Sequence, residues 1–453
     1  MTPFSRLTLE FRQTFWLALP LIAASAGNHV MGLVDMAVVG RLGEIPMAAA
    51  SLGNALYFGS GMLGMGLLFG LDPLVSQAVG ENNRQRAYNI FQQALRLAWG
   101  LSLPLGLLCF ALFGVLSLLK VDAGTQHETM LYLLARVPGL LPFYVYITYR
   151  GYLQALEKTR GILFATILAN LLNIPLSIFL AHGGPTLAYI GITGVTWQGW
   201  GVMGAGLAST LVTFVQMWFL WRSLPADDNL EKPPYTLAGL LPVLRVGWPI
   251  AVQLLAEGGV FVTVTLIMGV FGPTVVSGHQ IALQCATLTF SICVGISSAA
   301  SVRVGHAVGQ RDHHKARRAG VVALFMGVTM MMGSAWLFWT KAAWLSSLFT
   351  DKTHIINASL PFFQMAALFQ IVDGLQHISL GSLRGAGQTR IPMITNLVSH
   401  WLIAVPFGLW VTFGLKWGPR GLWMGLVLGL TLVGIMLTTT FFRMSSKPIE
   451  VLK

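Results

Sequence analysis

The chain has 453 residues, of which 55% are hydrophobic and only 10% are charged, and its mean hydropathy is +0.70. So few charges cannot cover a water-solvated surface, which excludes an ordinary soluble domain. The formal net charge of +12 could indicate nucleic-acid binding, but the basic residues lie in short loops between apolar runs, so we expect no nucleic-acid partner.

Apolar runs long enough to cross a bilayer recur along the whole chain, since a spanning helix needs roughly 20 residues. They lack the polar and apolar alternation of an outer-membrane barrel. The sequence therefore predicts an all-α integral membrane protein with twelve transmembrane helices. We expect them near residues 14–39, 47–78, 90–119, 129–152, 160–182, 199–222, 241–270, 275–306, 316–339, 355–383, 389–414 and 419–443.

Most of the 28 Lys and Arg residues lie in the loops on the side that carries both termini. By the positive-inside rule this side is cytoplasmic. We therefore expect a multi-pass protein of the cell (inner) membrane with both termini in the cytoplasm. Arg6 and Arg12 before the first apolar run imitate a secretory signal, but the run continues to Val39, so we expect no cleavage.

The second half of the chain repeats the first, because four segments recur in the same order. They are LALPLIA at 17–23 with VGWPIAV at 246–252, AVGENNRQRA at 78–87 with AVGQRDHHKA at 307–316, GYLQALEKTR at 151–160 with GSLRGAGQTR at 381–390, and WGVMG at 200–204 with WGPRG at 417–421. Fewer residues separate the two segments of the last pair than separate those of the other pairs, because the first copy has a longer Gly-rich loop at 183–199.

Each copy holds six predicted helices, an even number, so the two copies form parallel six-helix repeats. We predict an N-terminal lobe at 1–222, a cytoplasmic linker at 223–240 and a C-terminal lobe at 241–453. An architecture of two lobes favours transport by alternating access, with a site at the lobe interface.

Carboxylates inside the predicted helices are the first candidate functional residues, because each costs at least roughly 2.5 kcal/mol at the centre of a bilayer. Asp35, Glu257 and Asp373 are embedded in this way. The alternative is that each is neutralised by hydrogen bonds to a neighbouring helix. Asp72 precedes Pro73 near a helix end, and we interpret it as structural.

Polar residues lie on the same helix faces as these carboxylates. The candidates are Asn28 on the face of Asp35, Gln253 on the face of Glu257, and Gln370 and His377 on the face of Asp373. The fifth predicted helix, 160–182, places Asn170, Asn173 and Ser177 on one face, close to Pro175. Oxygen atoms of these kinds suit a hard monovalent cation, whereas the alternative is that they hydrogen-bond helices together.

Other embedded polar residues carry weaker signals. His29, His279 and His377 are interpreted as packing or loop histidines rather than proton relays, although His377 shares a face with Asp373, and the role of Arg136 is left open. The three cysteines have no metal or redox spacing. The sequence has no Walker loop, zinc-ligand spacing or nucleophile elbow. We therefore expect that the protein is not an enzyme and that it uses no cofactor.

Several of these motifs together resemble the multidrug and toxic compound extrusion (MATE) family, and within it the NorM-like branch. They are GLVDMAVVGRLG at 32–43, the AVGENN and AVGQRD loops, GSLRGAGQTR at 381–390 and NIPL at 173–176. The resemblance covers nearly the whole chain. It implies a MATE-type fold and an antiporter that exports cationic or amphiphilic drugs and toxic compounds in exchange for Na⁺ or protons.

The resemblance also assigns roles residue by residue. The family's acidic residues fall on Asp35, Glu257 and Asp373, which would bind the coupling cation, including Na⁺, and its helix-five asparagine falls on Asn173. Ser177 stands where NorM-like proteins often have a second Asn or Asp, which weakens a sodium site in the N-terminal lobe. We expect the three carboxylates to line a central cavity of a monomer and to bind cation and drug competitively.

Two other functions remain open from the sequence. The first is a flippase for a lipid-linked precursor of the same superfamily, whose cavity should be cationic. The second is a membrane receptor or channel, which the duplicated fold disfavours.

Overall fold

The structure, a computed structural model, describes residues 3–118, 121–184, 197–226, 230–234 and 236–452. Within these ranges, twelve helices are long and apolar enough to cross a membrane, as the hydropathy predicts. Parts of the Gly-rich loop predicted at 183–199 and of the linker predicted at 223–240 lie outside the described residues.

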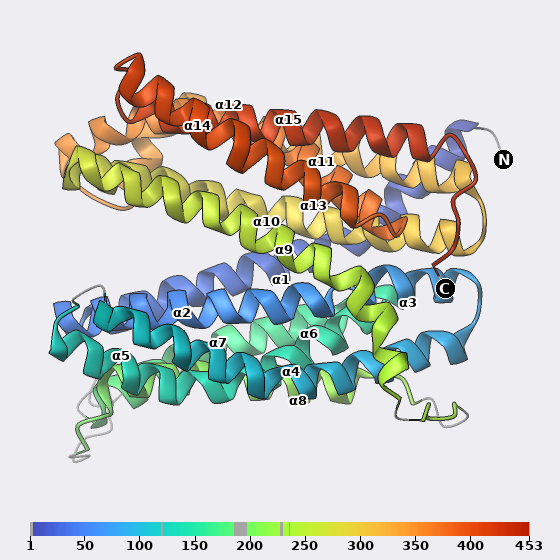
Figure 1. The fold of residues 1–453 in the computed structure, drawn as a ribbon, viewed down its shortest axis with the longest axis horizontal. Coiled ribbons are helices and arrows are strands. Elements are labelled where there is room, and N and C mark those ends of the chain that lie inside the picture. The colour runs from blue at the N-terminus through green and yellow to red at the C-terminus, as the bar shows by residue number, and fades with distance from the viewer. Residues whose placement is uncertain (1–2, 119–120, 185–196, 227–229, 235, 453) are drawn as a thin grey trace. The chain divides into compact units, whose positions relative to one another are not determined.

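Figure 1 shows the helices of the first half in blue to green. They are α1 (Pro3–Gly40), α2 (Glu44–Leu68), α3 (Leu71–Gly80), α4 (Arg84–Leu118), α5 (Ala123–Arg136), α6 (Leu140–Ala155), α7 (Arg160–His182) and α8 (Gly201–Ser223). Pro138 lies in a 3₁₀ turn, Val137–Gly139, which separates α5 from α6. One predicted span is therefore broken in the middle, directly after Arg136.

The helices of the second half repeat this order. They are α9 (Leu237–Met268), α10 (Pro273–Gly309), α11 (His313–Ser347), α12 (Thr353–Gly385), α13 (Arg390–Leu397), α14 (Val405–Leu409) and α15 (Arg420–Met444). The π-helical segments Val398–Ala404 and Trp410–Gly414 continue the span that contains α13 and α14. The eleventh predicted helix is thus one span of mixed helical geometry.

The backbone confirms the sequence repeat at the turns. Asn82 and Arg311, at matching positions of the AVGENN and AVGQRD loops, both adopt the left-handed conformation, with φ of 57° and 58°. The next residue in each loop, Asn83 or Asp312, accepts a hydrogen bond from the backbone N–H three residues later, at 2.9 Å and 2.8 Å. Such caps satisfy a free donor at the start of the following helix, so both copies turn in the same way.

The chain forms two compact units. The C-terminal unit contains Met1–Ala26, Asp72–Ala87 and Trp248–Lys453, and the N-terminal unit contains Gly27–Leu71 and Tyr88–Gly247. Helices α1 and α9 therefore contribute one part to each unit. The lobe boundaries predicted above follow the sequence repeat and stay a prediction.

In the C-terminal unit, α12 packs against α10, α11 and α15. Trp423, Phe362 and Phe363 are fully buried in its core. A buried ion pair adds to this packing, because Arg303 donates from Nε to Glu10 Oε1 at 2.8 Å and from Nη2 to Glu10 Oε2 at 3.0 Å. Glu10 is 4% exposed, although nothing in the local sequence pattern marks it as buried.

In the N-terminal unit, α8 packs against α7, α5 and α6, and α2 packs against α5. Small residues allow close approach, as at Gly204 of α8, where an added Cβ would lie 2.0 Å from the carbonyl oxygen of Leu180 in α7. Such contacts are common between membrane helices, which have no hydrophobic force between them and associate through close packing. This packing positions the walls of the cavity described next.

Candidate functional site

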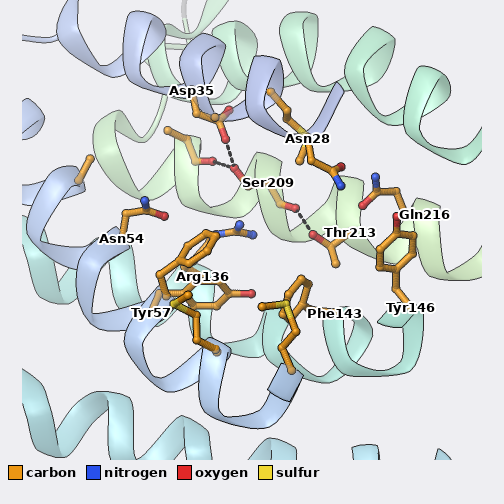
Figure 2. Close-up of a pocket in the computed structure, with 18 of the residues that line it drawn as sticks. Asn28, Asp35, Asn54, Tyr57, Arg136, Phe143, Tyr146, Ser209, Thr213 and Gln216 are labelled. Carbon is orange, nitrogen blue, oxygen red and sulfur yellow. Dashed lines mark hydrogen bonds between the residues drawn. The ribbon is translucent and has the colours of Figure 1, made fainter. Parts of the chain in front are cut away.

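A cavity of about 250 Å³ opens within the N-terminal unit. Helices α1, α2, α5, α6 and α8 supply its walls, which Figure 2 shows in close-up. Its lining is mainly apolar, with Met31, Met36, Met62 and Met65 among the residues around it. Flexible, polarizable methionine side chains can adapt to ligands of different shape.

Asp35 of α1 is the carboxylate of this cavity. Its Oδ1 accepts a hydrogen bond from Ser177 Oγ at 3.1 Å, and its Oδ2 accepts one from Ser209 Oγ at 2.8 Å. Thr213 extends the network by donating to the carbonyl oxygen of Ser209 at 2.7 Å. Hydroxyl donors of this kind stabilise a carboxylate away from water, so the two serines hold the Asp35 side chain in place inside the unit.

Arg136 and Tyr57 lie across the cavity from Asp35 (Figure 2). The guanidinium carbon of Arg136 is 4.4 Å from the centre of the Tyr57 ring, a cation–π contact. A second arginine, Arg150, and the amides of Asn54 and Gln216 also line the cavity. The sequence-predicted Asn28 lies among them, on the same helix as Asp35.

A second polar cluster lies inside the C-terminal unit, on α9 and α12. His377 lies between the two carboxylates, with Nε2 3.4 Å from Glu257 Oε1 and Nδ1 3.0 Å from Asp373 Oδ1. Glu257 Oε1 also accepts a hydrogen bond from Gln376 Nε2 at 3.0 Å. All four residues are at most 9% exposed. The embedded acids of this unit are therefore joined through one imidazole.

Two residues of α10 contact His377. The Phe290 ring of α10 meets it edge to face, with 4.4 Å between ring centres. Ser297 Oγ donates to the His377 carbonyl oxygen at 2.6 Å. Within the described part of the chain, Asp373 Oδ2 has no hydrogen-bond partner, and no group of three or more His, Cys, Asp or Glu side chains is arranged to hold a metal ion.

The remaining predicted residues divide between these clusters and packing. Gln370 is fully buried and donates to Thr289 Oγ1, and Gln253 is buried with no partner for Nε2 among the described residues. Asn170 donates to the carbonyl oxygen of Thr166 in its own helix, at 2.9 Å. Asn173 is fully buried, and neither of its amide atoms has a partner in the described ranges.

His279 behaves as a packing histidine, in line with the interpretation from sequence. It accepts at Nδ1 from Trp423 Nε1, at 3.1 Å, and its Nε2 is 3.0 Å from Thr265 Oγ1. Both ring nitrogens therefore have partners in the core of the C-terminal unit.

Sequence reasoning brought Asp35, Ser177 and the Glu257 cluster to attention, but it missed Ser209 and Gln376. Ser209 sits in an apolar run with no neighbouring charge in sequence. The signal for Gln376 was available, since it directly precedes His377 and follows Asp373 by three positions. The structure brings Glu257 and Asp373 together, and it assigns Asp35 to the other unit.

Long apolar helices in two copies, with carboxylates retained among them, define a polytopic membrane transporter. Comparison with known proteins agrees. The profile of the MatE family matches residues 20–179 and 249–410. The chain is 32% identical to the "Probable multidrug resistance protein NorM" of Xylella fastidiosa (strain 9a5c), covering 98% of this chain and 94% of that one. It is also 32% identical to the protein of that name in Deinococcus radiodurans, covering 97% and 96%.

Solved structures share the fold. The crystal structure of the eukaryotic MATE transporter AtDTX14 superposes with a TM-score of 0.85 at 20% identity, covering 96% of both chains. The outward-facing conformation of a multidrug resistance MATE family transporter superposes with a TM-score of 0.86 at 18% identity, covering 96% of both chains. The chain belongs to the MatE family, in its NorM-like branch.

Proposed function

We propose that this transporter is a cation-coupled antiporter of the cell (inner) membrane that exports cationic and amphiphilic drugs and toxic compounds. The observation that carries the proposal is the retention of buried carboxylates in both units, each held by specific donors. The multidrug resistance names of its relatives support the same substrate class. We further propose that the protein works as a monomer with both termini in the cytoplasm.

In this proposal the coupling cation binds at Glu257 and Asp373. Na⁺ prefers oxygen ligands, whereas here an imidazole nitrogen lies within 3.4 Å of each carboxylate. This arrangement favours protons over sodium. Cation binding changes the charge of the cluster. One charge state favours the inward-facing conformation of the transporter, and the other favours the outward-facing conformation.

The drug is proposed to bind in the cavity of the N-terminal unit. Asp35 supplies a negative charge for a cationic centre, and the methionine and aromatic side chains supply apolar contact. The membrane potential adds about 2.3 kcal/mol per inward charge at 100 mV. At about 1.4 kcal/mol per decade, one inward cation can drive roughly a fortyfold gradient of a neutral drug.

Efflux of ethidium from proteoliposomes, with sodium and pH gradients imposed separately, tests this function. We expect the pH gradient to drive efflux, and we expect Asp373→Asn to abolish the gradient-driven component. The matched control is Asp351→Asn, a carboxylate exposed in the turn before α12, which should leave efflux unchanged. Efflux that ignores both gradients would rule out coupling.

The second candidate is a flippase for a lipid-linked precursor. Arg136 and Arg150 in the cavity favour it, because such a ligand carries a pyrophosphate. Asp35 in the same cavity favours drug export. Transport of an anionic lipid that survives Glu257→Gln would support the flippase.

A further inference from the structure

A histidine of the C-terminal unit is fully buried with one ring nitrogen unused. His400 lies in the π-helical segment Val398–Ala404. Its Nδ1 is 3.1 Å from the carbonyl oxygen of Asn396. Because a carbonyl oxygen only accepts, Nδ1 carries a hydrogen, and Nε2 keeps a lone pair in the neutral ring. Nε2 is buried with no hydrogen-bond partner among the described residues, although buried polar atoms nearly always have one, so this nitrogen is available to a proton.

The segment that carries His400 packs beside Glu257. Trp401, the next residue, donates from Nε1 to the carbonyl oxygen of Ala256 at 3.0 Å, and Ala256 directly precedes Glu257 in α9. π-Helical geometry is rare and is frequently found at functional sites. This π-helical segment is therefore held against the part of α9 that contains the acid.

Within the described part of the chain, the ionisable groups that act on the His400 ring all belong to the buried cluster of the C-terminal unit. They are Glu257 of α9 and Asp373 and His377 of α12. The neighbour from α15 is Gly429, where an added Cβ would lie 3.2 Å from His400 Cδ2. Negative charges favour a proton on the ring, whereas a protonated His377 opposes one. The charge of His400 therefore depends on the charge of the cluster.

The sequence repeat separates the packing role of this position from its chemistry. Asn170 occupies the matching position of the first copy, the same number of residues after the repeated Thr-Arg pair. Its amide donates to the carbonyl oxygen of Thr166 at 2.9 Å, just as His400 donates to that of Asn396. An asparagine is therefore sufficient for the structural contact, and the imidazole adds a group that can bind a proton.

The same replacement of neutral by titratable side chains runs through the whole cluster. Counting from the repeated segments, the second copy has Glu257, Asp373 and His377 where the first copy has Asn28, Phe143 and Ile147. His400 in place of Asn170 follows this pattern. We therefore group His400 with the coupling residues and not with the packing histidines.

We propose that His400 is a proton-binding residue of the coupling cluster, which takes up a proton at Nε2 and releases it as the charge of Glu257 and Asp373 changes. The inference rests on the proposed coupling to protons and adds a residue to it. Uptake forms an N–H bond at the Nε2 lone pair and makes the ring a cation, and release breaks the same bond. A proton held there partly offsets the negative charge of the two acids.

Replacing His400 by asparagine, the residue of the first copy, tests this role. The amide can keep the hydrogen bond to the Asn396 carbonyl oxygen, but it cannot bind a proton. Ethidium efflux from proteoliposomes is measured as the pH on the side that supplies protons is lowered. Because one proton-binding group is lost, we expect the His400→Asn protein to need an about tenfold higher proton concentration for half-maximal efflux. Its unfolding temperature in detergent should be unchanged.

The matched control is His354→Asn, which removes an exposed histidine in the first turn of α12 and should leave the proton dependence of efflux unchanged. A folded His400→Asn protein with the proton dependence of the unmodified protein would overturn the role of His400. Efflux by the unmodified protein that ignores pH would instead contradict the proposed function.

The ring nitrogen can also be observed in the unmodified protein, whether or not the variant folds. In solid-state NMR of protein labelled at histidine nitrogen and glycine carbon, contact with Gly429 identifies the His400 ring. As the pH is lowered, its Nε2 signal should change from that of a nitrogen with a lone pair to that of a protonated nitrogen. A signal that keeps the lone-pair form until the protein unfolds would overturn the proposal. Because this measurement needs no transport, a titrating Nε2 in a protein without pH-driven efflux would count against the proposed function alone.

Discussion

Replacing Glu257 by glutamine tests the cluster of the C-terminal unit most sharply. The substitution keeps the shape of the side chain and removes its charge. It also removes the charged partner of Gln376 Nε2 at 3.0 Å and of His377 Nε2 at 3.4 Å. Truncating one partner of a buried, hydrogen-bonded charge pair costs about 2 to 5 kcal/mol. At about 1.4 kcal/mol per decade, affinity for the coupling cation should fall at least about thirtyfold.

The assay is ethidium efflux from proteoliposomes as the coupling gradient is varied. We expect the Glu257→Gln protein to need a much larger gradient for the same efflux. Ethidium binding without a gradient should persist, because the drug cavity is built from residues of the N-terminal unit. Glu44→Gln, at an exposed carboxylate in the first turn of α2, is the matched control. Unchanged gradient dependence in Glu257→Gln would refute the reasoning.

Two further substitutions test the N-terminal unit. Ser209→Ala removes the hydroxyl 2.8 Å from Asp35 Oδ2, so we expect ethidium binding to weaken by about tenfold in a fluorescence titration. Ser102→Ala, at a half-buried serine of α4 bonded within its own helix, should have no effect, and equal binding by both variants would contradict this role of Ser209. Gly204→Ala inserts a methyl group 2.0 Å from a carbonyl oxygen of α7 and should destabilise the protein by about 1–3 kcal/mol. Thermal unfolding in detergent should show this loss of stability as a lower unfolding temperature. Gly100→Ala is the control and should leave the unfolding temperature unchanged, because a Cβ added at Gly100 has no atom within 4 Å. Equal unfolding temperatures for the two variants would contradict the close packing at Gly204.

The helices and the repeat could be predicted from sequence because both follow from local patterns. Apolar length decides where a span runs, and a turn that needs a left-handed residue, as at Asn82 and Arg311, leaves a recurring motif. Asp35 and Glu257 stood out for the same local reason, since each is a charge in an apolar run.

The partners of these charges could not be predicted in the same way. In a membrane, the face of a helix toward lipid is as apolar as the face toward its neighbours, so hydrophobic periodicity says little about which way a side chain points. Ser209 reaches Asp35 from 174 residues away in sequence. Gln370 was expected beside Asp373, yet its amide donates to Thr289 of α10. Such contacts depend on how each helix is rotated.

The measurement that tests coupled exchange most directly is cation movement driven by drug alone. Proteoliposomes loaded with ethidium and diluted into drug-free buffer, with equal pH and sodium on both sides, should take up protons or radioactive sodium as ethidium leaves. The account predicts uptake that stops in Asp373→Asn. Ethidium release with no accompanying cation uptake, or uptake unchanged in that variant, would contradict it.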